Sequence, residues 1–131
     1  MKLRHLAIGI FLTTTVALGQ ATDPTVVINE FVAINDSGLR DEEGDFSDWI
    51  ELHNHGTETV NLAGVSLTDD RKRLAKWTFP ETQLEPGQFL IVHMSGKDRR
   101  AGGEPLHASF ALRGKGDYLG LIASDGKTVI D

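Results

Sequence analysis

The 131-residue sequence contains no cysteine, and this absence removes several kinds of chemistry. Disulfide bonds, thiol catalysis and cysteine-ligated zinc are all excluded. A domain of this size can bury roughly 65% of the surface of its unfolded chain. An ordinary hydrophobic core is therefore expected to hold the fold together without a cross-link.

Helical periodicity is also missing, because no stretch of ten or more residues after position 21 repeats its apolar positions every 3.6 residues. Short segments rich in β-branched and aromatic residues follow one another instead, separated by Gly, Pro, Asn and Asp. This pattern predicts an all-β, antiparallel β-sandwich. The expected strands span 25–33, 48–54, 59–62, 65–68, 76–79, 88–94, 109–112 (a short strand or an extended segment), 118–123 and 128–130.

The chain has one long apolar run, at its N-terminus. Lys2 and Arg4 precede a mostly apolar stretch over 6–19, and small residues up to Ala21 offer a cleavage site. This pattern is typical of a secretory signal peptide. An uncleaved membrane anchor is the alternative, although the run is short and rich in threonine for a bilayer span. We expect a signal peptide at 1–21, one domain at 22–131 with a short or truncated last strand, and export to the extracellular space, cell surface or periplasm.

Positive charge is scarce. Removal of the predicted signal peptide leaves 11 Lys and Arg against 19 Asp and Glu, and the formal charge changes from −6 to −8. Such an acidic domain is poorly suited to nonspecific binding of nucleic acid or anionic membranes. We expect neither partner, whereas divalent cations would suit the charge.

Carboxylates are concentrated in the loop before the second expected strand. Asp41, Glu43, Asp45 and Asp48 offer the hard oxygen ligands that calcium takes, and they are the candidate metal ligands. The spacing is not that of an EF-hand, because Gly44 stands at the fourth position of the run rather than the sixth. A weak calcium site on these four residues is one prediction for the loop.

The alternative for the same loop is structural. Asp side chains accept hydrogen bonds from nearby backbone N–H groups in Asx-type turns. In this interpretation Asp48 fixes the loop at the point where Trp49 enters the core. Ile50 and Leu52 are expected to face one way, with Trp49 and Glu51 on the opposite face.

Other titratable residues give weaker indications. Glu30 and Glu51 lie in the middle of consecutive expected strands, and paired carboxylates are used in glycoside hydrolysis, but no cleft-forming segment flanks them. A hydrolase is therefore a remote alternative. Four histidines could bind zinc in principle, although their spacing is not typical of a zinc site. They are His53, His55, His93 and His107.

Two basic segments, 71–73 and 97–100, interrupt the acidic sequence. The common outcome for such segments is two solvated loops. Alternatively, if they meet at one end of the sandwich, they would form a bipolar surface with the acidic loop.

Several motifs occur in a fixed order along the chain: VINEF at 27–31, GDFSDWIELHN at 44–54, VNL at 60–62 with Gly64, WTFP at 77–80 and LEPGQFL at 84–90. This set resembles the bacterial lamin-tail domains, and the resemblance covers nearly all of residues 26–131. It implies an immunoglobulin-like sandwich and a non-catalytic module, often found beside other extracellular domains in exported bacterial proteins. Family members in nuclear lamins bind protein partners and chromatin, a role that does not carry over to an acidic exported protein.

The sequence therefore predicts a secreted, non-catalytic binding, adhesion or structural module that needs no cofactor apart from the calcium considered above. Its ligand is expected to be a protein or a cell-surface polymer that contacts end loops, which vary freely on a rigid scaffold. A calcium-stabilised spacer within a larger exported protein is the alternative. The lamin-tail resemblance implies the same absence of catalysis.

Overall fold

The computed structural model describes residues 25–116 and 118–131, so the predicted signal peptide lies outside the described part of the chain. Strands and turns make up these residues. Within the same ranges, no helix is long and apolar enough to cross a membrane.

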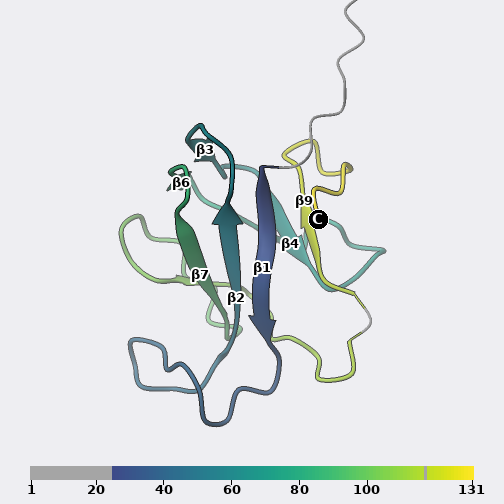
Figure 1. The fold of residues 1–131 in the computed structure, drawn as a ribbon. Coiled ribbons are helices and arrows are strands. Elements are labelled where there is room, and N and C mark those ends of the chain that lie inside the picture. The colour runs from purple at the N-terminus through teal and green to yellow at the C-terminus, as the bar shows by residue number, and fades with distance from the viewer. Residues whose placement is uncertain (1–24, 117) are drawn as a thin grey trace, which may run out of the picture.

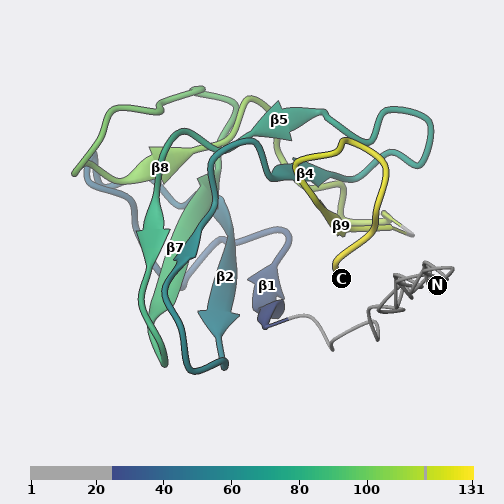
Figure 2. The ribbon, with the colours of Figure 1, turned by 90° about the horizontal axis from the view of Figure 1, so that it is seen from above.

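The strands form three sheets. The larger sheet has the order β1-β2-β7-β8, a second has the order β5-β4-β9, and β3 pairs with β6. Figure 1 shows β1, β2 and β7 side by side, and Figure 2 separates this layer from the layer of β5, β4 and β9. The strands are β1 (Val26–Val32), β2 (Asp48–Asn54), β3 (Val60–Asn61), β4 (Ser66–Thr68), β5 (Trp77–Thr78), β6 (Gln83–Leu84), β7 (Phe89–Met94), β8 (Leu106–His107) and β9 (Gly120–Ile122).

The predicted all-β sandwich is confirmed, and all strand pairs in these sheets are antiparallel except the parallel pair of β7 and β8. The core lies between the two main layers. Ile50 and Leu52 point inward and are fully buried, as their alternation predicts. Trp77 is 1% exposed and meets Phe79 in an edge-to-face contact with ring centroids 4.9 Å apart.

Trp49 does not enter this core, contrary to the sequence-based expectation. It alternates with Ile50 along β2, so its side chain lies on the outer face of the sheet, where it is half-buried. Its indole nitrogen has no hydrogen-bond partner in the described part of the chain. The central tryptophan of the sandwich is Trp77 instead.

Apolar residues on both faces of the segment 25–33 predict a first strand covered on two sides, and this prediction is also wrong. β1 stands at the edge of its sheet, and a β-bulge between Ile28 and Glu30 shifts its register against β2. After the bulge Glu30 and Phe31 are exposed, and the Phe31 side chain retains 57% of its surface. The prediction depended only on the apolar residues on both faces of the strand. That pattern does not distinguish an edge strand from a central one.

Two very short strands were not predicted from the sequence. β6 and β8 have two residues each, and neither shows a periodic pattern in the sequence. The segment 109–112 forms no strand, and the expected strand at 128–130 is reduced to one bridge between Ile122 and Val129. Pro86 followed by Gly87 predicts a turn at 84–87, with a positive φ at Gly87 if the turn is type II. The structure confirms the positive φ, which is 77° at Gly87.

Candidate functional site

The acidic loop between β1 and β2 folds around Asp41. Its Oδ1 accepts hydrogen bonds from the backbone N–H groups of Glu43 and Asp45, each at 3.0 Å. Its Oδ2 accepts from Ser47 Oγ at 3.1 Å and from Lys97 Nζ at 2.7 Å. The carboxylate is buried and satisfied on both oxygens, so the Asx-type interpretation of the loop is confirmed at Asp41.

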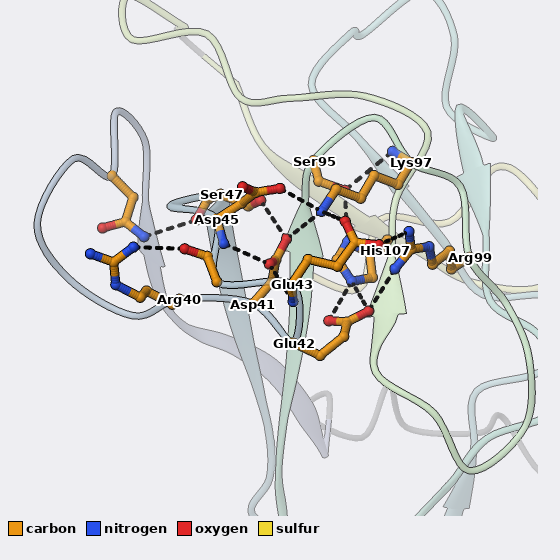
Figure 3. A network of polar contacts seen from close by, with 12 residues as sticks. Arg40, Asp41, Glu42, Glu43, Asp45, Ser47, Ser95, Lys97, Arg99 and His107 are labelled. Atoms are coloured by element: carbon orange, nitrogen blue, oxygen red, sulfur yellow. Dashed lines mark hydrogen bonds and ion pairs between the residues drawn. The ribbon is translucent and has the colours of Figure 1, made fainter.

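Lys97 connects this loop to the loop after β7. Its ammonium lies 2.7 Å from Asp41, 2.6 Å from Glu43 and 3.0 Å from Asp45. The two loops are more than 50 residues apart in sequence, and Figure 3 shows their side chains converging on one another. The single positive charge of Lys97 thus offsets one of the three negative charges that are crowded here.

A second set of contacts lies beside the first. Arg99 donates to Glu42 at 2.8 Å and also contacts Glu43. The buried His107 of β8 has Nε2 2.9 Å from the Glu42 carboxylate and Nδ1 2.7 Å from Ser95 Oγ. Because an ionised carboxylate only accepts, Nε2 carries the proton, and in the neutral ring Nδ1 accepts from the serine hydroxyl.

We refer to these seven charged or titratable residues as the loop cluster; they are Asp41, Glu42, Glu43, Asp45, Lys97, Arg99 and His107. Figure 3 shows that they come from two loops and from β8, at the end of the sandwich opposite β3 and β6 in Figure 1. A disulfide would join such segments in many exported domains, but here ion pairs and hydrogen bonds do so.

The electrostatics of the loop cluster favour ionised carboxylates. Burial by itself would raise the pKa of Asp41, but hydrogen bonds from Lys97, Asp45 and Glu43 outweigh burial and hold the pKa well below its usual range. The hydrogen bond from His107, supported by backbone and Arg99 contacts, lowers the pKa of Glu42 to about 2. A general acid at neutral pH needs a raised pKa, so these carboxylates are unsuited to that role.

The loop after β7 also reaches the core. Asp98 adopts a positive φ of 52° and accepts hydrogen bonds from Trp77 Nε1 at 2.9 Å and from Arg100 Nε at 2.8 Å. The hydrogen bond from Trp77 satisfies the indole of the central tryptophan. The position of Lys97 and Arg99 is therefore coupled through their neighbour to the packing of the sandwich.

Of the four residues predicted to hold calcium, the fold brings three together and places the fourth elsewhere. Asp41, Glu43 and Asp45 have oxygen atoms within 4.8 Å of one another. Asp48 lies elsewhere, and its Oδ1 accepts from the backbone N–H groups of Ile34 and Asn35 at 2.8 and 3.1 Å. In the described residues a second metal-competent group comprises Asp41, Glu42 and His107.

The remaining candidates are distributed over the sheet. Glu30 and Glu51 are direct cross-strand partners, and Glu51 accepts from the amide of Asn29 at 2.8 Å. They lie on the outer face of β1 and β2, where two like charges oppose one another.

The histidines form two separate pairs. The rings of His53 and His55 are 6.3 Å apart, and those of His93 and His107 are stacked at 4.9 Å. No metal-competent group among the described residues combines histidines from both pairs. Of the basic segments, 97–100 joins the acidic loop, whereas Arg71 stacks on Tyr118 at 4.1 Å.

Sequence reasoning identified the acidic half of the loop cluster but not its partners. Lys97 and Arg99 belong to the basic segment 97–100, for which the sequence leaves two alternatives, a solvated loop or a bipolar surface with the acidic loop. No sequence pattern links Ser95 or His107 to that loop. Charge complementarity between two distant segments was the available signal. It could not show which cation meets which carboxylate, because that depends on how β7 and β8 bring the loops together.

An all-β sandwich of two main layers, with a charged cluster that joins two of its loops, is the architecture of an immunoglobulin-like module. The family comparison gives the same result in more specific terms. A family model described as Lamin Tail Domain matches residues 19–131. The chain belongs to the lamin tail domain family, whose members are non-enzymatic immunoglobulin-like modules. Comparisons with curated proteins and with solved structures returned no match.

Proposed function

We propose that the chain is a binding module of an exported protein and that its ligand is a protein or a cell-surface polymer. The observation that carries this proposal is the exposure of large apolar side chains in one segment, 31–46. Grouped apolar exposure is typical of interaction surfaces. The exposed side chains of this segment are Phe31 (57%), Ile34 (70%), Leu39 (43%) and Phe46 (37%).

The hydrogen bonds and ion pairs of the loop cluster hold the acidic loop, which is part of this segment, in one conformation. Asn35 adds to it, because its amide nitrogen donates to the backbone carbonyls of Leu39 and Ser47 at 2.6 and 2.9 Å. A loop fixed in this way loses little conformational entropy when it binds. Arg40 lies 3.7 Å from the centre of the Phe46 ring, so that aromatic side chain is held in place while it is exposed.

The binding proposal is tested by immobilising the chain and passing over it purified surface proteins and surface polysaccharides of the producing cell. We expect one class to be retained, and a Leu39→Ser/Phe46→Ser double variant to bind it about tenfold more weakly. Phe89→Ser is the matched control, because Phe89 is 51% exposed but lies in β7 rather than in segment 31–46. Equal loss in the control, or no retention at all, would contradict the proposal.

Export is tested separately. Residues 1–21 are fused ahead of a reporter enzyme that is active only outside the cytoplasm, with a Leu6→Arg variant as the control. Reporter activity that is present with the natural segment and lost in the variant is expected. Activity in neither fusion would contradict export.

A glycosidase function is the remote alternative, and Glu30 and Glu51 would have to perform it. Glu30 is exposed and Glu51 is half-buried on the outer face of the sheet, which offers no enclosed site for a sugar ring. We expect no turnover of chromogenic glycosides. Turnover that Glu51→Gln abolishes would overturn this expectation.

A calcium-stabilised spacer is the second candidate function, favoured by the convergence of Asp41, Glu43 and Asp45. Calcium would have to displace the Lys97 ammonium from these oxygens, which implies weak affinity, on the order of millimolar as in extracellular modules. Thermal unfolding with calcium and with chelator tests it. A midpoint that rises with calcium, and rises more in Lys97→Met, is expected from this function; an unchanged midpoint in both proteins contradicts it.

A further inference from the structure

The free edge of β1 leaves backbone groups available for pairing. The N–H of His55 donates to the carbonyl of Thr25 at 2.9 Å, so alternation turns the backbone of Val26 and Ile28 away from β2. The N–H of Ile28 donates to a side-chain oxygen, Asp131 Oδ2, at 2.8 Å, rather than to the backbone of a neighbouring strand. Figure 2 shows β1 at the margin of its layer, with the C-terminal end of the chain beside it.

Two adjoining hollows follow this edge and have Phe31 and Leu119 in common. One, of about 410 Å³, is bordered by Ile28, Glu30 and Asp131. The other, of about 200 Å³, is bordered by Ala33, Asp69, Leu112 and Tyr118. Together they form what we call the edge groove, which runs along β1 from residue 28 to residue 33.

The exposed residues of the edge groove are unusual for a solvent-facing surface. Phe31 is 57% exposed, and Ile34, just beyond the groove, is 70% exposed. Ile34 also has a φ of 63°, a conformation that a β-branched residue rarely adopts. Strain of this kind is concentrated at sites of function in folded proteins.

An acceptor without a partner lines the same groove. The Asp69 side chain is 5% exposed, and its Oδ1 pairs with Lys76 Nζ at 2.6 Å. Its Oδ2 is buried and has no hydrogen-bond partner within residues 25–116 and 118–131. Buried polar atoms are nearly always satisfied, so an unpaired carboxylate oxygen at the wall of a hollow indicates a donor supplied by a ligand.

The side chains that line the edge groove indicate which chemical class of ligand fits it. Phe31, Leu112 and Tyr118 suit an apolar or aromatic group. Lys76 already balances the charge of Asp69, and Arg113 adds a positive charge at the border of the hollow, so a neutral donor is favoured over a cation. An aromatic group with a polar N–H or O–H, as in tryptophan or tyrosine, meets these conditions.

We propose that the edge groove binds an extended peptide segment of a protein partner, which adds to β1 as a further strand and places a tyrosine or tryptophan side chain against Asp69. Unpaired strand edges take up polypeptide because only another backbone offers donors and acceptors at the matching spacing. A polysaccharide lacks this repeat. The inference rests on the proposed binding function and makes it specific for a protein ligand.

The side-chain pocket is tested with small probes in solution. The chain is titrated with 4-methylphenol, and toluene is the matched probe without the hydroxyl donor, with backbone amide signals followed by NMR. We expect 4-methylphenol to shift the signals of Phe31, Ala33 and Leu119 and to bind about fivefold more tightly than toluene, as one added hydrogen bond implies. Asp69→Ala should abolish the difference between the probes. Equal binding of the two probes to the natural chain overturns the assignment of Asp69.

Strand addition is tested with a seven-residue peptide of alternating threonine and valine with a central tyrosine. The matched control is the same peptide with alternate backbone nitrogens methylated, which removes the donors that would face β1. We expect the unmodified peptide to shift signals along residues 28–33 and the methylated one to bind about tenfold more weakly. Phe31→Ala should weaken binding, whereas Phe89→Ala, an equally exposed phenylalanine outside the groove, should not.

Two results would overturn the proposal. If the peptide leaves the β1 signals unchanged, the edge groove is not a strand-addition site. In that case the proposed binding function still holds if the Leu39→Ser/Phe46→Ser variant loses its surface ligand, and it fails if the variant does not. Failure of the edge groove and failure of the binding function are therefore distinguishable. If sedimentation shows that the chain self-associates through Phe31, the added strand belongs to a second copy and not to a partner.

Discussion

The loop cluster and the edge groove lie in the same small domain but differ in how completely their polar groups are hydrogen-bonded. In the loop cluster the Asp41 carboxylate accepts four hydrogen bonds, and Lys97 meets three carboxylates. In the edge groove Asp69 Oδ2 is unpaired and Phe31 is exposed. A satisfied network fixes structure, whereas unsatisfied groups are available to a ligand. The comparison therefore separates the part of the molecule that holds the fold from the part where binding is expected.

The largest expected effect is on the loop cluster. Asp41→Ala removes four hydrogen bonds and leaves Lys97 facing fewer carboxylates, so the free energy of unfolding should fall by about 3 kcal/mol. Asp45→Ala is the matched control, because the Asp45 side chain is 63% exposed and contributes one contact to Lys97. Urea unfolding measures both. Equal losses would show that burial of Asp41 is not what stabilises the loops.

The pH dependence of stability should separate two contributions. The pKa of His93 is lowered from 6.5, first by burial and then by the nearby His107, so folding disfavours its charged form. Its contribution is complete above pH 6.5 and is lost as the pH falls below that value. The pKa of Glu42 is lowered from 4.5 to about 2, so its contribution is complete above pH 4.5 and is lost as the pH falls towards 2.

Unfolding in urea at a series of pH values from about 8 to about 3 checks this prediction. Stability should decline in two stages on acidification, and His93→Phe should remove the first stage and keep the second. A chain whose stability is constant between pH 6.5 and 4.5 would contradict the role of His93.

A smaller effect is expected where the acidic loop leaves β1. Asp48→Ala deprives the backbone N–H groups of Ile34 and Asn35 of their acceptor and should lower the free energy of unfolding by about 1 kcal/mol. Asp36→Ala is a suitable control, because the exposed Asp36 carboxylate is bonded only to the adjacent Ser37 hydroxyl among the contacts described. A similar loss in both variants would show that the N–H contacts of Asp48 are unimportant.

The smallest expected effect concerns strain beside the edge groove. Ile34→Asn replaces a β-branched residue at a φ of 63° by one that tolerates this conformation, and it should raise the free energy of unfolding by about 0.5–1 kcal/mol. Val129→Asn provides the comparison, because Val129 is 53% exposed and is not among the residues with positive φ. A destabilising Ile34→Asn would mean that the contact of Ile34 with the backbone at Gly114 outweighs the strain.

Much of the fold followed from local pattern. The alternation in 48–54 correctly placed Ile50 and Leu52 inside, and the Pro-Gly pair before β7 correctly placed a turn. The same alternation put Trp49 on the face opposite Ile50 and Leu52, so the expectation that Trp49 enters the core was wrong. A tryptophan is not assigned to a core by its type, and here Trp77 fills that position.

The candidate site was predicted in part. The sequence indicated Asx-type acceptors in the acidic loop and singled out Asp48, but it gave no means to separate Asp48 from Asp41, Glu43 and Asp45 as a group. Their oxygens converge because the loop doubles back: the Asp41 N–H donates to the Asp45 carbonyl, and the Gly44 N–H donates to the Asp41 carbonyl. Asp48 is already in β2 and points to the end of β1 instead.

The sequence by itself determined the all-β class, the absence of cross-links, the family and the acidic character of the loop, because each depends on residue type and on spacing along the chain. The tertiary structure alone decided that Lys97, Arg99 and His107 meet this loop, and that β1 lies at an edge beside Asp69. Ion pairing and strand order depend on distances in space between segments far apart in sequence. Local periodicity and composition carry no measure of those distances.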